Sequence, residues 1–148
     1  MKTHNDDNYK KALKEARKKN ADLEKVYALL KKSFNDGNPD AAYALGTFYL
    51  FGKHVRKNYR QAFRYLRIAA KHNVPNAHYD LAVSYETGVG LKKNTKRAFK
   101  HYFQAAMNGD KQSFYEIGRC YYYGIGIEKN TVLADIWLYK AYSYGIKR

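Results

Sequence analysis

The sequence predicts an all-α fold: an α/α solenoid (a right-handed superhelix) of stacked antiparallel helix pairs, with about eight helices. The first observation behind this prediction is self-similarity, because three segments of 36 residues follow one another without gaps over 38–73, 74–109 and 110–145. The second is that each copy contains two helical patterns, separated by glycine and asparagine at fixed positions. Repeats of this length indicate helix pairs that bury their apolar faces only by stacking on their neighbours.

In each copy, small and apolar residues recur every three or four positions of the first half, which is the spacing of one helical face. The matching columns are Tyr43/Tyr79/Tyr115, Leu45/Leu81/Ile117, Tyr49/Tyr85/Tyr121, Gly52/Gly88/Gly124, Asn58/Asn94/Asn130, Ala62/Ala98/Ala134 and Ala69/Ala105/Ala141. The glycine column is expected to end the first helix, and the asparagine column to cap the start of the second. Small residues at Gly46, Ala82 and Gly118 should let the paired helices approach closely.

In the second half of the first copy, Ala62, Leu66 and Ala69 form the expected buried face. The second helices should end at Asn73, Gly109 and Gly145.

Residues 1–37 fit the period poorly and are interpreted as a degenerate N-terminal helix pair. Its second helix is expected over Asp22 to Phe34, with Val26, Leu30 and Ser33 one period before the buried residues of the first copy. Its first helix is expected from about Asp6 to Lys19. The whole chain is thus predicted to be a single solenoid domain over residues 1–148, with residues 146–148 as a tail.

The formal net charge of +15 is spread along the chain, and no quarter of it is acidic. This charge favours an acidic protein, a nucleic acid or an anionic membrane surface as partner. No window approaches the roughly 18 apolar residues that a membrane helix needs. A lone cysteine, Cys120, makes no internal disulfide. We therefore expect a cytoplasmic protein without a membrane partner.

The sequence YYYGIGIEKN (121–130) raises the question of a phosphate-binding loop. A dinucleotide-binding loop needs a third glycine and a preceding strand, and neither is expected here. The five histidines, His4, His54, His72, His78 and His101, show no metal-ligand spacing. No nucleophile or acid/base pair is recognisable, so we expect no catalytic residues, no metal, no cofactor and no enzymatic activity.

The pattern A-x-x-x-L-G-x-x-Y-x-x-G-x-G, followed by A-x(6)-A-A-x-x-G, resembles the Sel-one-like repeat family, which is related to the tetratricopeptide repeat. Three departures stand out: Lys53-His54 replaces the second glycine, Ser113 replaces the leading alanine of copy three, and asparagine replaces the family's aspartate at 58, 94 and 130. The resemblance implies an interaction scaffold, and a short member could be an immunity-type partner that blocks one toxin.

Three surfaces are candidate binding sites. In a solenoid the first helices line the concave side. The residues expected there are Tyr43, Thr47, Leu50, Tyr79, Val83, Glu86, Tyr115, Arg119 and Tyr122. Tyrosine and arginine are enriched at binding hot spots, although the tyrosine column could equally serve packing.

A basic surface is expected on the second helices, and either solvation or phosphate binding explains it. It comprises Arg60, Arg64, Arg67, Lys96 and Lys100. In copy three the same positions become apolar, giving a patch of Val132, Ile136 and Trp137 that suggests cover by another chain or a partner. A homo-oligomer formed through this C-terminal repeat is one reading, and different local packing is another.

These observations predict a non-enzymatic protein–protein interaction scaffold, a small cytosolic adaptor or inhibitor that binds an acidic protein or peptide through its concave groove. The alternative is nucleic-acid binding through the basic second helices.

Overall fold

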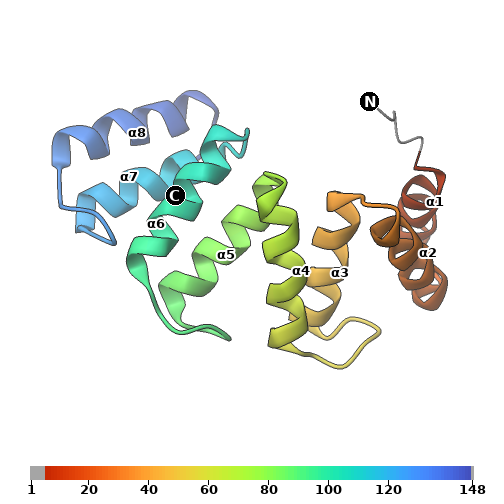
Figure 1. Cartoon of the computed structure of the whole chain (residues 1–148). Helices are drawn as coiled ribbons and strands as arrows, with labels where there is room; N and C mark the ends of the chain where they lie inside the picture. Colours follow the sequence, from red (N-terminus) through yellow and green to blue (C-terminus); the bar gives the residue numbers. More distant parts are fainter. Residues whose placement is uncertain (1–5, 148) are drawn as a thin grey trace. The chain divides into compact units, whose positions relative to one another are not determined.

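The computed structural model describes residues 6–147, and within that range it contains eight α-helices and no strand (Figure 1). The helices are α1 (Asp7–Ala16), α2 (Leu23–Asn35), α3 (Pro39–Phe51), α4 (Tyr59–Lys71), α5 (Pro75–Thr87), α6 (Thr95–Met107), α7 (Gln112–Tyr123) and α8 (Thr131–Ser143). The predicted all-α repeat fold with eight helices is confirmed. His4 and Arg148 lie outside the described residues.

The chain divides into two compact units, Met1–His72 and Asn73–Arg148, which are described separately. We call them the N-terminal and C-terminal units. The division falls beside the expected boundary between the first and second copies. That the whole chain forms one solenoid domain stays a prediction. Among residues 6–147 no helix is both long and apolar enough to cross a membrane.

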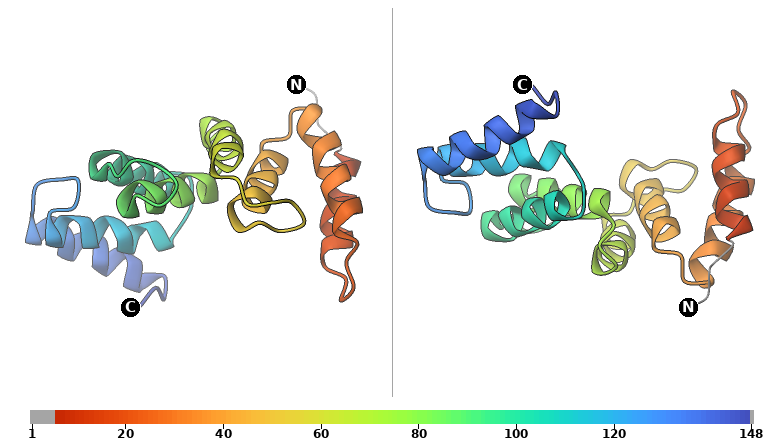
Figure 2. Two further views of the ribbon diagram at one scale, coloured as in Figure 1. Left: turned by 90° about the horizontal axis from the view of Figure 1, so that it is seen from below. Right: turned by 90° about the horizontal axis from the view of Figure 1, so that it is seen from above.

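Each unit consists of two helix pairs that stack on one another. The pairs are α1/α2 and α3/α4 in the N-terminal unit, with α2 packed against α3, and α5/α6 and α7/α8 in the C-terminal unit, with α6 packed against α7. Both views in Figure 2 show α7 and α8 side by side. A Cβ placed on Gly118 would lie 2.7 Å from Leu138 Cγ, which is closer than real side chains approach. The expectation that small residues permit close pairing is therefore confirmed.

The turn inside each of the three copies follows the predicted chemistry. Gly52, Gly88 and Gly124 end the first helices with φ of 67°, 73° and 73°, in the left-handed region that glycine enters without a Cβ penalty. The asparagine column then caps the second helices. Asn58, Asn94 and Asn130 accept hydrogen bonds from the backbone N–H groups of Gln61, Arg97 and Leu133 at 3.1, 3.1 and 3.0 Å.

His54 occupies the position of the missing second glycine, and the backbone keeps the same conformation there. Its φ is 64°, whereas Gly90 and Gly126 in the other copies have 74° and 70°. A side chain in this region costs about 1 kcal/mol. The turn therefore keeps its left-handed backbone conformation with histidine in place of glycine, because the rest of the repeat fixes the path of the chain.

The degenerate first pair is present, but α1 ends at Ala16, before the expected Lys19. The Asp6 side chain connects this pair through hydrogen bonds. Its carboxylate accepts from the Tyr9 backbone N–H at 2.9 Å, from Asn38 Nδ2 at 2.7 Å and from Ser33 Oγ. One carboxylate thus joins the start of α1 to α2 and to the start of α3.

The core is made mostly of small residues in the predicted columns. Ala62, Leu66 and Ala69 are completely buried, as expected, and Ser33 is completely buried in the first pair. Ser113, which replaces the leading alanine of copy three, is also fully buried, and its Oγ donates to Asp110. A small polar residue therefore fits because a carboxylate satisfies its hydroxyl.

Cys120 lies on α7 and is completely buried. Burial raises the pKa of its thiol to about 12, and thiolate, not thiol, is the reactive form. We expect the Cys120 thiol not to react with Ellman's reagent over minutes in the folded protein. In denaturant this single thiol should react completely. Rapid labelling of the folded chain would contradict the buried position.

Candidate functional site

An ion-pair network in the C-terminal unit joins α5 to α7. The Arg119 guanidinium donates from both terminal nitrogens to the Glu86 carboxylate, at 2.8 and 2.7 Å, in the bidentate geometry that makes such pairs strong. Its Nε donates to Glu116 Oε2 at 2.9 Å. The three side chains are 25%, 19% and 12% exposed for Arg119, Glu86 and Glu116. One cation therefore holds two carboxylates in a partly buried site.

Two tyrosines complete this network. Tyr102 on α6 donates to Glu86 Oε2 at 2.7 Å, and Tyr79 on α5 donates to Glu116 Oε1 at 3.4 Å. Their rings meet edge to face with centroids 5.7 Å apart. The network thus spans three helices and two consecutive copies.

The network shifts the pKa values of its members. The hydrogen bond from Arg119 lowers the pKa of Glu86 below its ordinary value, against the opposing effect of burial. Burial, followed by the nearby Glu116 carboxylate, raises the pKa of Tyr79 to about 12. Burial and the hydrogen bond to Glu86 raise the pKa of Tyr102 in the same direction. At neutral pH the site therefore holds a charged Glu86 carboxylate and the protonated hydroxyls of Tyr79 and Tyr102.

Three residues of the predicted concave row, Tyr79, Glu86 and Arg119, are thus brought together by the fold. Glu86 and Arg119 bind each other, whereas Tyr79 donates to Glu116, and these contacts join copy two to copy three. The sequence placed them in neighbouring rows, but it did not show that the charges of Glu86 and Arg119 meet.

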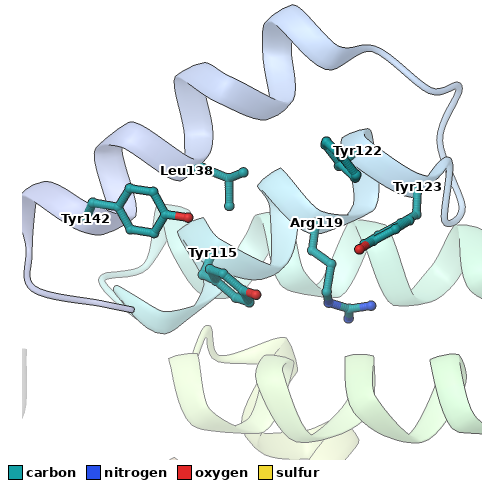
Figure 3. A pocket seen from close by; sticks show the side chains of 6 residues that line it. All are labelled: Tyr115, Arg119, Tyr122, Tyr123, Leu138 and Tyr142. Atoms are coloured by element: carbon teal, nitrogen blue, oxygen red, sulfur yellow. The ribbon is translucent and has the colours of Figure 1, made fainter. Parts of the chain in front are cut away.

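Beside this network, α7 and α8 enclose a hollow of about 180 Å³, which we call the tyrosine hollow (Figure 3). Its lining consists of Tyr115, Arg119, Tyr122, Tyr123, Leu138 and Tyr142. Tyr122, Tyr123 and Tyr142 are 45%, 59% and 49% exposed, so their rings are accessible. All three predicted concave residues of copy three, Tyr115, Arg119 and Tyr122, line this hollow.

Sequence reasoning missed the other half of the lining. Tyr142 stands in the column that holds Ala106 one copy earlier, and Leu138 stands in the column of Tyr102. The change from alanine to tyrosine was the available signal, because a large side chain cannot occupy the space that a buried alanine fills.

The remaining concave candidates are half-buried. Thr47 turns its hydroxyl back to its own helix, where Oγ1 donates to the Ala44 carbonyl at 2.7 Å. The others are Tyr43, Leu50 and Val83. Of these, only Val83 belongs to the C-terminal unit. That all nine residues form one concave surface stays a prediction.

The basic candidates are all exposed. Arg60, Arg64 and Arg67 lie on α4 of the N-terminal unit, whereas Lys96 and Lys100 lie on α6 of the C-terminal unit. The Arg64 guanidinium lies over the Tyr65 ring, 5.4 Å from its centroid. The five cations are therefore divided between the two units, and a single basic surface stays a prediction.

The apolar candidates on α8 divide in the same way. Val132 and Ile136 are 68% and 57% exposed. Trp137 is half-buried and stacks on Phe114, with ring centroids 5.9 Å apart. It therefore belongs to the packing between α7 and α8, and Val132 and Ile136 remain as the exposed pair.

Within the described residues, no group of three or more His, Cys, Asp or Glu side chains is arranged to hold a metal ion. The hollow itself holds no histidine or cysteine. The arrangement can supply aromatic contact area, tyrosine hydroxyls and one guanidinium that two carboxylates already engage.

Comparison with protein families gives a match to the Sel1 repeat at residues 39–74, 75–110 and 115–145. The chain belongs to the Sel1 repeat family. The three matched Sel1 repeats follow the three copies found in the sequence, and the tyrosine hollow lies in the third. The resemblance stated from the motif is confirmed.

Solved Sel1 repeat structures are similar over most of the chain. A Sel1 repeat protein from Oxalobacter formigenes is 36% identical, with 80% of this chain and 89% of that one covered and a TM-score of 0.74. The protective antigen c5321 of uropathogenic Escherichia coli strains, which displays an SLR fold, is 26% identical with a TM-score of 0.88. That match covers 94% of this chain but 30% of the antigen.

Helicobacter pylori cysteine-rich protein B is 27% identical, with coverage of 82% and 92% and a TM-score of 0.62. No curated protein matches the chain. Sel1 repeat proteins are generally protein–protein interaction scaffolds.

Proposed function

We propose that this Sel1 repeat chain is a non-enzymatic binding module, a small cytosolic adaptor or inhibitor that holds one acidic protein partner through the tyrosine hollow. The observation that supports this proposal is the hollow itself. It gathers four tyrosines, three of them with exposed rings, around a concave surface. The narrower role of an immunity-type inhibitor rests on the family resemblance alone.

Tyrosines suit such a surface for a physical reason. Each gives a large rigid contact area at a low cost in conformational entropy, and its hydroxyl supplies one hydrogen bond. Tyr122 and Tyr123 already meet edge to face with centroids 4.9 Å apart, which limits their freedom before a partner arrives. A partner that covers these rings would therefore bury apolar area without ordering long flexible side chains.

The charge of the chain supports an acidic partner through long-range attraction. A net charge of +15 accelerates the approach of an acidic protein, and this effect weakens as salt is added. Arg119 contributes little to direct recognition, because Glu86 and Glu116 already neutralise it. We therefore assign affinity to the tyrosines and association rate to the dispersed charge.

The exposed cations of α4 and α6 favour nucleic-acid binding as the alternative. Such binding would fall steeply with salt, because phosphate contacts release counterions. It would also be lost on substitution of Arg60, Arg64 and Lys100, and it would be indifferent to the tyrosines of the hollow.

The experiment is affinity capture from nuclease-treated lysate of the organism that encodes the chain, at physiological salt. It compares the wild-type chain with the double variant Tyr122→Ala/Tyr142→Ala and with Lys96→Ala as a matched surface control. We expect one acidic protein to be captured by the wild type and the control and reduced about tenfold with the double variant, as for loss of two hot-spot residues.

Isothermal titration calorimetry with the purified partner should then show binding to the wild-type chain. Substitution of Tyr122 should weaken this binding, as it weakens capture. Capture that survives the double variant would overturn the proposal. Capture that occurs only in a parallel lysate without nuclease treatment would also overturn it.

A further inference from the structure

The repeat itself shows how the tyrosine hollow can be filled. In the C-terminal unit, α7 packs on the preceding pair through Glu116, which accepts from Tyr79, and through Arg119, which pairs with Glu86. Tyr102 belongs to the same surface, since its hydroxyl donates to Glu86. The second Sel1 repeat therefore presents a surface on which a helix sits.

One period later, the same columns line the tyrosine hollow. Tyr79 corresponds to Tyr115. Glu86 corresponds to Tyr122, and Tyr102 corresponds to Leu138. In the described residues no helix covers them, and exposure rises accordingly: Ala106 is 4% exposed, whereas Tyr142 in its column is 49% exposed. The hollow is thus the third repeat's version of a surface that receives a helix in the second.

We infer that the hollow binds an amphipathic, acidic α-helix of a partner protein, seated as α7 is seated on α5 and α6. This inference rests on the proposed function and names the part of the partner that is recognised. Docking of a helical apolar face into a groove is a general mode of peptide recognition.

The column changes define the chemistry of that helix. Tyr122 replaces Glu86 in the third repeat, so the hollow has no carboxylate at this position to pair with an arginine. The bound helix should therefore carry an apolar side chain where α7 carries Arg119. Tyr115 keeps the hydroxyl that in Tyr79 donates to Glu116, so the helix should carry a carboxylate there. The expected partner helix therefore has an apolar stripe beside a carboxylate side chain.

The net charge decides between a partner and a second copy of this chain. Two copies would bring together two charges of +15, which repel, whereas an acidic helix is attracted. Self-association through the C-terminal repeat is therefore an outcome that the test must detect and that would count against the inference.

The probes are acetylated, amidated peptides with a helix-fixing lactam bridge, patterned on residues 110–123 with alanine in place of the cysteine. The arginine peptide keeps Arg119, and the leucine peptide carries Arg119→Leu. Fluorescence anisotropy with full-length chain measures their affinities. We expect wild type to prefer the leucine peptide about tenfold, and a leucine peptide with Glu116→Lys to bind about tenfold more weakly.

The decisive variant restores the second repeat's chemistry. Tyr122→Glu should reverse the preference, so that the arginine peptide binds about tenfold more tightly than the leucine peptide, because it recreates the Glu86–Arg119 pair. Tyr122→Phe is the matched control and should keep the wild-type preference. Equal affinities in all chains, or no binding of either peptide, would overturn the inference.

Sedimentation velocity tests whether the chain itself forms a dimer through the hollow. A wild-type dimer that Tyr122→Glu dissolves would make a second copy the occupant and contradict the partner helix. If lysate capture depends on Tyr122 but neither peptide binds, helix docking fails while the proposed function stands. If the peptides behave as expected and no cellular protein is captured, the proposed function fails while the surface retains its helix-binding geometry.

Discussion

Gly126→Ala is expected to destabilise the C-terminal unit by about 3 kcal/mol, the combined effect of a strained backbone and an overpacked contact. Gly126 has a φ of 70°, and a Cβ built there would lie 1.9 Å from the carbonyl oxygen of Thr95 at the start of α6. Because the opposing atom belongs to the backbone, no side-chain movement relieves the clash. Urea unfolding followed by the fluorescence of Trp137, the single tryptophan, measures the change in this unit.

Gly124→Ala is the matched control for that substitution. Its φ of 73° imposes nearly the same backbone strain, but the added Cβ would lie 3.5 Å from Lys129 Cβ, an ordinary contact. We expect a loss of about 1 kcal/mol from the left-handed conformation alone. Equal midpoints for the two variants would show that the approach of Gly126 to α6 is not as tight as the structure has it.

Arg119→Ala is expected to destabilise the same unit by about 3 kcal/mol, because removing one member of a buried ion pair leaves its partners uncompensated. Here two carboxylates, those of Glu86 and Glu116, would remain close together without the cation. Arg119→Lys should fall between the wild type and the alanine variant, since an ammonium keeps the charge but not the bidentate geometry. The measurement is again urea unfolding at neutral pH with Trp137 fluorescence.

Its pH dependence separates the ion pair from simple loss of packing. Because the pKa of Glu86 is lowered in the folded chain, its contribution to stability is fully present above the unfolded pKa of roughly 4.3 and is lost as pH falls through the folded value. The stability difference between wild type and Arg119→Ala should therefore be largest at neutral pH and shrink in acid. A difference that stays constant with pH would assign the effect of Arg119 to its alkyl chain.

The helices and turns were predictable because each copy repeats the same local chemistry. The glycine at the end of one helix and the asparagine at the start of the next act within a few residues, so three copies confirm one another. The end of α1 was less accurate, since residues 1–37 have no second example to compare. Ala16 is followed by a turn that no glycine or proline marks in the sequence.

The candidate site was only half predictable, because it depends on contacts between copies. Two different columns of the repeat place Arg119 and Glu86 on the same expected face. Whether their side chains face a partner or each other depends on packing distances that the sequence does not contain. Trp137 illustrates the same point: the sequence places it in an apolar surface patch, but its ring packs against Phe103 and Phe114. Tyr142 could have been found, because its predecessor Ala106 is too small to be replaced without exposing the ring.

The asparagine caps have a consequence for behaviour in acid. An amide oxygen accepts the same hydrogen bond at any pH, so α4, α6 and α8 keep their N-terminal fastening when carboxylates become protonated. The first pair relies instead on Asp6 and Asp22, whose side chains cap α1 and α2. The hydrogen bonds at the starts of α4, α6 and α8 should therefore persist in acid independently of any carboxylate.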